Sequence, residues 1–240
     1  MEFLLFILAV AAGAVAAVSG FGIGSLLTPA LAVSTGTKLA VAAVSVPHLI
    51  GTAGRFWILR RKVDREVLLR FGAASAAGGL AGALAHVWIS SRALAVAFGV
   101  IVAAAGLSEL TGWVSRVRWG RRAAWAAGAL SGALGGLVGN QGGIRTAAML
   151  GFDVPKESFV ATSTAVALFV DGARLPVYLA TEWPDLMRVW PYLVVLSAGV
   201  LVGTVVGTRA LDRIPQQTFR KVIGALLVAL GAYMIVWGRG

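Results

Sequence analysis

The sequence contains no cysteine, and only 13% of its 240 residues are charged, against about 25% in an average soluble domain. Without cysteine, the chain has no disulfide framework, no thiolate nucleophile and no cysteine metal site. Its two histidines, His48 and His86, are too few nitrogen ligands for a transition-metal site. We therefore expect neither a metal nor any other cofactor, and the scarcity of charge excludes both a soluble globular domain and a disordered chain.

Hydrophobic residues make up 58% of the chain and gather in eight apolar segments. These segments are 3–33, 39–59, 67–89, 94–110, 123–152, 158–180, 189–210 and 219–237. Six of them have about the 20-residue length of one membrane crossing. The sequence thus predicts an all-α polytopic membrane protein, with the lipid bilayer as its surroundings.

The net charge of +11 would suggest nucleic-acid binding in a soluble protein. Here the basic residues lie in short runs between apolar segments, where they set membrane topology instead, and we expect no nucleic-acid partner. The N-terminal apolar stretch begins with Glu2 and has no basic residue before it. A secretory signal requires a positive start, so we expect this stretch to be part of the fold.

An internal duplication is visible without gaps at an offset of 119 residues. This offset places Gly13 on Gly132 and Arg55 on Arg174, and farther along the offset grows so that Gly99 falls on Gly224. The arginine match carries the most weight because arginines within apolar segments are rare. We expect two homologous halves, 1–118 and 119–240, within one integral membrane domain. Such duplications are common in secondary transporters.

The first and fifth apolar segments are longer than one crossing, and a glycine cluster interrupts each. Glycines at close spacing weaken a helix and permit positive φ, so each segment is predicted to form two half-helices around an unwound turn. If both segments fold back as re-entrant hairpins, fourteen basic residues lie inside and four outside; with the fifth segment crossing once, the split is eleven to seven. The positive-inside rule favours the hairpins.

The predicted topology is therefore two halves, each a broken or re-entrant helical hairpin plus three transmembrane helices. An odd number of crossings per half makes the halves inverted repeats, with both termini outside and the loop around 116–122 inside. The alternative is an ordinary eight-helix protein with parallel halves.

The two glycine breaks are the first candidates for a binding site. Unwound backbone at membrane depth survives only where protein buries it or where it lines a cavity. The half-helix after each break presents unpaired N–H groups and a positive dipole end, which favour an anion. The candidate residues are Gly22, Gly24, Ser25, Asn140, Gln141, Gly142 and Gly143. The alternative is that the glycines only allow close helix packing.

Ionisable residues within the apolar segments are the second group of candidates. Arg55, Arg145 and Arg174 lie outside the loops, and Asp171 lies three residues before Arg174, on the same helical face. We expect Arg55 and Arg174 to bind an anion; the alternatives are snorkelling of Arg55 to the basic loop and a buried pair between Arg174 and Asp171. Arg145 is compatible with a cap on the second hairpin.

Three further residues lie near the predicted site. Ser45 falls on Thr164 in the duplication, and the two hydroxyls are candidate ligands or helix–helix hydrogen bonds. His48 could carry a proton near neutral pH. We take His48 and Asp171 as candidates for coupling transport to H⁺; a histidine that only packs in the core is the alternative for His48.

No Ser-His-Asp set, HExxH motif or Walker loop is present, so we expect no catalytic residues and no enzyme activity. Transport would then be driven by gradients. A non-transporting membrane scaffold or assembly factor and an anion channel are the alternatives. The sequence leaves the oligomeric state, the coupling ion and the direction of transport open.

The duplicated glycine breaks, the stretch SGFGIGSLLTP at 19–29 and the proline-containing second helix resemble the TauE/SafE sulfite-exporter family. The resemblance implies a carrier in the cell membrane of a bacterium or archaeon for small sulfur-containing anions, such as sulfite, thiosulfate or organosulfonates. It also implies that the loops 20–24 and 139–143 flank the substrate. The first loop reads GFGIG where many members have GxGGG, so we expect the second loop to make more of the direct contacts.

Overall fold

The computed structural model describes residues 2–19, 22–112, 121–140, 142–149, 155–210 and 216–238, and every regular element in these ranges is a helix. The first part contains α1 (Glu2–Ser19), α2 (Ile23–Thr35), α3 (Thr37–Leu59), α4 (Arg65–Val67), α5 (Ala73–Trp88) and α6 (Ser91–Thr111). The second contains α7 (Arg121–Val138), α8 (Gly142–Met149), α9 (Lys156–Arg188), α10 (Trp190–Ala210) and α11 (Gln216–Trp237). A 3₁₀ turn (Arg60–Lys62) follows α3, and a π-helical turn (Leu68–Gly72) joins α4 to α5.

Within the described residues, six helical stretches are long and apolar enough to cross a membrane. They are Thr37–Lys62, Arg65–Trp88, Ser91–Thr111, Glu157–Arg188, Trp190–Gly207 and Arg220–Trp237. Large apolar side chains such as Trp88, at 89% exposure, and Phe3, at 74%, lie on the outer surface, where lipid would cover them. The predicted all-α polytopic membrane fold is confirmed.

The two predicted helix breaks are present at the glycine clusters. The first lies between α1 and α2, and the second between α7 and α8. Gly22 has φ +130° and Gly139 has φ +75°, values that residues with a Cβ rarely adopt. The chain therefore leaves the helical path at each cluster because glycine makes this possible. Gly20 and Gln141 lie outside the described residues.

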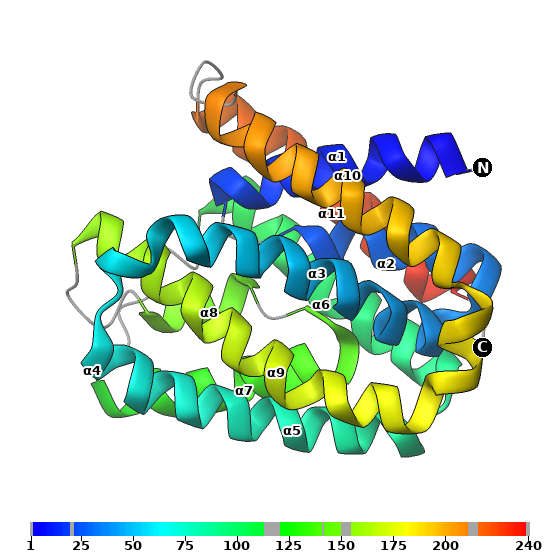
Figure 1. The fold of residues 1–240 in the computed structure, drawn as a ribbon, viewed down its shortest axis with the longest axis horizontal. Coiled ribbons are helices and arrows are strands. Elements are labelled where there is room, and N and C mark those ends of the chain that lie inside the picture. Colours follow the sequence, from blue (N-terminus) through cyan, green and yellow to red (C-terminus); the bar gives the residue numbers. More distant parts are fainter. Residues whose placement is uncertain are drawn as a thin grey trace.

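The helices lie along the long axis of the molecule, and both ends of the chain lie at one end of this axis (Figure 1). At this terminal end, the Lys38 backbone N–H donates to Ser91 Oγ (3.1 Å), and Arg92 donates to the Gly238 carbonyl (2.8 Å). We call the opposite end, which carries Arg60–Lys62 and the start of α9, the basic end.

Each pair of half-helices returns to the end where it began. From the N-terminus, α1 runs away from the terminal end and α2 runs back to it (Figure 1). Helix α6 starts at Ser91 at the terminal end and therefore ends at the basic end. The second half begins with α7, which follows from there. The next helix, α9, also starts at the basic end, where Glu157 pairs with Lys62. Each of the pairs α1–α2 and α7–α8 therefore enters the bundle and returns to the same end without crossing it.

The helices that correspond to each other in the duplication run antiparallel. Gly99 of α6 packs against Gly231 of α11, and Gly106 packs against Gly224: a Cβ built on either α6 glycine would lie 2.6 Å from the opposite carbonyl oxygen. The order of these contacts is reversed between the two helices. The same holds for α3 and α9: His48 of α3 contacts Asp171 in the middle of the bundle, and Lys62, in the 3₁₀ turn after α3, pairs with Glu157 at the basic end.

The contacts of α1 with α10 and of α5 with α7 are parallel and are also made by glycine. A Cβ on Gly203 of α10 would lie 2.0 Å from the Val10 carbonyl oxygen of α1, and one on Gly82 of α5 would lie 2.0 Å from the Ala133 carbonyl oxygen of α7. Backbones this close leave no room for side chains, as in the small-residue contacts of membrane helices. Each half-helix hairpin is thus held by a helix of the other half.

One predicted boundary is wrong. The sixth apolar segment was expected to end at 180, but α9 continues to Arg188 and includes residues 182–185. The charged residues there are compatible with helix, and Asp185 pairs with Arg188 one turn later. Hydropathy therefore falls before the helix ends.

Candidate functional site

The described residues contain more buried positive than negative charge. Arg55, Arg145 and Arg174 are 6%, 2% and 1% exposed, and Asp171 is the only buried carboxylate among these residues, at 0%. The arginines all lie within apolar helices. Asp171 is bound to Arg174 and His48, so no buried carboxylate of the described residues pairs with Arg55.

Asp171 forms the centre of a hydrogen-bonded cluster near the middle of α9. Its Oδ1 atom accepts from Arg174 Nε (3.0 Å) and Nη2 (2.8 Å), and its Oδ2 atom is 2.7 Å from His48 Nδ1. The buried pair considered from the sequence is thus formed, and His48 joins it from α3. Both oxygens of the carboxylate are engaged, so this cluster is already neutralised within the protein.

Side chains bind three consecutive carbonyl groups near the end of α7. The bonds run from Arg174 Nη1 to Gly135 (2.7 Å), from Tyr178 Oη to Gly136, and from His86 Nδ1 to Leu137 (2.8 Å). The last carbonyls of a helix have no partner within it, and a broken helix inside a bundle cannot reach water. These three side chains therefore stabilise the second break.

Tyr178 and His86 were not recognised as functional from the sequence. Tyr178 follows Arg174 by four residues and so lies on the same face of α9, which is the signal that could have found it. His86 comes from α5 and packs its ring 5.0 Å from that of Tyr178. Its role depends on the packing of α5 against α7, which the sequence did not predict.

Arg55 makes in the first half the contact that Arg174 makes in the second. Its Nη1 atom donates to the Ala16 carbonyl near the end of α1, and the offset of 119 residues that relates Arg55 to Arg174 also relates Ala16 to Gly135. Arg55 thus points into the bundle rather than snorkelling to the basic loop. Each arginine holds the end of the first half-helix in its own half.

The two glycine breaks meet in the structure. A Cβ on Gly24 would lie 2.4 Å from the Gly139 carbonyl oxygen, and one on Gly139 would lie 3.5 Å from Arg174 Nη1. The neighbouring polar side chains, Ser25 and Asn140, are 2% and 6% exposed. Asn140 Nδ2 has no hydrogen-bond partner within the described part of the chain. Gly22 and Gly142 are also buried, and Gly143 lies in the first turn of α8.

Arg145 belongs to this region as well, although the sequence suggested only a capping role. Its Nε atom donates to Ser163 Oγ (2.9 Å) of α9, and its charge is near enough to interact with those of Arg55 and Asp171. The sequence signal was the presence of a cation in an apolar segment, and the structure adds its proximity to Arg55.

Ser45 and Thr164 use their hydroxyl hydrogens within their own helices. Ser45 Oγ donates to the Ala42 carbonyl (2.5 Å), and Thr164 Oγ1 donates to the Val160 carbonyl (2.8 Å). Neither bond joins two helices. An anion requires donors, so in this conformation the two hydroxyls offer it less than the arginines and amides do.

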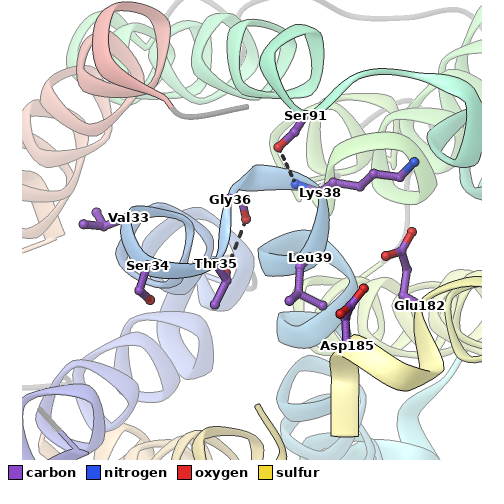
Figure 2. A pocket seen from close by; sticks show the side chains of 9 residues that line it. All are labelled: Val33, Ser34, Thr35, Gly36, Lys38, Leu39, Ser91, Glu182 and Asp185. Atoms are coloured by element: carbon purple, nitrogen blue, oxygen red, sulfur yellow. Dashed lines mark hydrogen bonds between the residues drawn. The ribbon is translucent and has the colours of Figure 1, made fainter. Parts of the chain in front are cut away.

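A cavity of about 460 Å³ opens at the terminal end of the bundle. Figure 2 shows its lining from the α2–α3 turn, the start of α6 and the last turns of α9. Lys38, Glu182 and Asp185 are its charged residues. None of its lining residues belongs to the buried arginine region, so in this conformation the cavity stops short of that region.

Comparisons with known proteins give one match. A family model described as sulfite exporter TauE/SafE matches residues 5–234. No curated protein matches the chain, and no solved structure matches it.

Proposed function

Since the chain belongs to the TauE/SafE sulfite-exporter family, a family of membrane transporters, we propose that it is a secondary transporter of small sulfur-containing anions. Sulfite, thiosulfate and organosulfonates are the substrates that we consider, and the cell membrane is the proposed location. The multi-pass helical fold agrees with this assignment.

The observation that carries the proposal is the buried charge of Arg55, which is 6% exposed. No buried carboxylate of the described residues pairs with this charge, because Asp171 is bound to Arg174 and His48. A charge left without a partner in a low-dielectric interior costs several kcal/mol, and in a membrane such residues face a partner or a pathway. An oxyanion with one or two negative charges would neutralise the charge of Arg55 and accept hydrogen bonds from its guanidinium group.

The position of the breaks supports a site between the two halves. The first break contacts the second at Gly24 and Gly139. Arg55 of α3, Arg145 of α8 and Asn140 of the second break belong to this region. Secondary transporters commonly bind substrate at such interrupted helices near the bilayer midplane. We propose that the anion binds here, with the half-helix N-termini and Gln141 adding donors.

Alternating access is the proposed mechanism. The antiparallel course of α6 against α11 and of α3 against α9 supports inverted repeats, because corresponding helices related by an axis in the membrane plane run in opposite directions. Each half would rock against the other about the meeting point of the breaks. The cavity at the terminal end would be the outer approach to the site, closed below Lys38 in this conformation.

The topology follows from the charges at the two ends. Arg60–Lys62, Arg65 and Arg70 lie at the basic end, which the positive-inside rule places in the cytoplasm. The N- and C-termini would then be outside. A membrane scaffold would have no need of a buried charge such as that of Arg55, which is why we favour transport over that alternative.

Flux measurements on the purified protein in proteoliposomes test the proposal. Radiolabelled sulfite should enter at a rate that saturates with concentration, and unlabelled thiosulfate or sulfoacetate should compete. Imposed proton and sodium gradients identify the coupling ion. A flux that rises linearly with sulfite and carries a large current would instead indicate a channel. No flux of any of the three anions under any gradient would contradict the proposal and favour a scaffold.

A further inference from the structure

The duplication allows the surroundings of Arg55 and Arg174 to be compared position by position. Both arginines use Nη1 to bind a carbonyl at the end of their half-helix, Ala16 in one case and Gly135 in the other. Arg174 uses its other two nitrogens, Nε and Nη2, to bind the Asp171 carboxylate. By this correspondence, Nε and Nη2 are the nitrogens with which Arg55 would bind a carboxylate at the position that matches Asp171.

That position is Thr52, which lies 119 residues before Asp171 and three residues before Arg55. Thr52 is 1% exposed and Arg55 is 6% exposed. Thr52 Oγ1 and Arg55 Nε both lack a hydrogen-bond partner within the described residues. Buried polar groups are nearly always hydrogen-bonded, so two such atoms on one helical face point to an acceptor that the described residues do not supply.

The group that flanks the carboxylate is also absent in the first half. His48 of α3 contacts Asp171 across the pair of antiparallel helices. The position that matches His48 in the second half is Ala167 of α9, which is fully buried. At the positions that correspond to Asp171 and His48, the hydroxyl of Thr52 thus replaces the carboxylate and the methyl group of Ala167 replaces the imidazole, and both are smaller.

We propose that an oxygen of the transported anion binds Arg55 Nε and the Thr52 hydroxyl, in the place that the Asp171 carboxylate occupies beside Arg174. This inference rests on the proposed function and names the binding groups within it. A sulfite or sulfonate oxygen accepts charge-assisted hydrogen bonds from a guanidinium group as a carboxylate oxygen does.

The asymmetry assigns different tasks to the two arginines. Arg174 is paired with the Asp171 carboxylate and stabilises the second break. Arg55 has an Nε–H group without a partner among the described residues, and this group binds substrate. Replacing Thr52 by aspartate should therefore give Arg55 the kind of ion pair that Arg174 makes with Asp171. The chain would then neutralise Arg55 with its own side chain, and the anion would have to displace it.

The test is sulfite binding and sulfite flux in Thr52→Asp, with Thr52→Asn as a neutral control of the same size. In Thr52→Asp, we expect the dissociation constant for sulfite to rise by at least about tenfold, as expected for losing one charge-assisted hydrogen bond, without loss of thermal stability in the absence of sulfite. In Thr52→Asn, which leaves the charge of Arg55 available, we expect a smaller rise of about threefold.

Wild-type sulfite affinity in a folded Thr52→Asp protein would overturn the inference while leaving the proposed function intact. Equal losses in the Asp and Asn variants would also overturn it, because the effect would then come from the change of shape. If Thr52→Asp does not fold, Thr52→Val decides: it keeps the shape and removes the hydroxyl, and unchanged affinity would contradict binding at Thr52. Failure of the wild-type protein to bind or move any of the three anions would instead refute the proposed function.

Discussion

Removal of the Asp171 charge should destabilise the protein strongly, and simultaneous removal of the Arg174 charge should restore much of the loss. Asp171→Asn keeps the shape of the side chain but leaves Arg174 buried without its anion and weakens the bond to His48. Breaking a buried ion pair on one side costs about 3–5 kcal/mol. In Asp171→Asn/Arg174→Gln, no unpaired charge remains, so the loss should be smaller than the sum of the single losses by about 1–3 kcal/mol.

The assay is reversible unfolding in mixed micelles, followed by the fluorescence of the eight tryptophans. The same helix provides a matched control. Asp185 and Arg188 have the same spacing and chemistry, but their side chains are 47% and 79% exposed. Asp185→Asn should therefore change the stability by no more than about 1 kcal/mol.

Additive losses in the double variant would refute the view that Asp171 and Arg174 form one buried unit. Flux adds a second criterion. If Arg174 only holds the second break, the double variant should recover sulfite transport as well as stability. Recovery of stability with transport still absent would show that Arg174 contacts the substrate, as the sequence alone suggested.

Four further outcomes are expected. Cysteines placed at the C-terminus of this cysteine-free chain should be labelled from outside and those in 113–120 from the cytoplasm; the reverse result would contradict the topology. His48→Ala should retain sulfite exchange but lose uphill transport driven by a proton gradient, and unchanged uphill transport would remove His48 from coupling. Gly24→Ala should lower stability by about 1–3 kcal/mol because its Cβ would meet a carbonyl oxygen at 2.4 Å, whereas Gly172→Ala, with nothing within 4 Å, should be neutral or stabilising. Gln141→Ala should raise the sulfite dissociation constant about tenfold to a hundredfold without lowering thermal stability. An unchanged dissociation constant would indicate that the second break serves only to let the helices pack closely.

The helix breaks could be predicted because their cause is local. Glycine clusters within apolar segments weaken helices wherever they occur, and Gly22 and Gly139 of the two clusters have positive φ angles. The end of α9 could not be placed, because hydropathy declines before the helix does. The end of a helix depends on capping and packing as well as on polarity.

Several residues of the site could be predicted from the sequence, but the contacts between them could not. The match of Arg55 to Arg174 follows from the sequence, but their bonds to Ala16 and Gly135 require the fold. The significance of Thr52 likewise emerges only when Asp171 is seen to occupy the nitrogens of Arg174. Threonine in an apolar helix is common and unremarkable by itself, so no sequence pattern distinguished it.

We propose that the transported anion binds beside the buried Arg55, whose charge pairs with no carboxylate of the described residues. Titration calorimetry of sulfite into the purified wild-type protein tests it most directly. The account predicts saturable binding of one sulfite per chain, which thiosulfate displaces and which Arg55→Gln weakens by at least about tenfold. Wild-type sulfite affinity in a folded Arg55→Gln protein, or no saturable binding to the folded wild type, would contradict it.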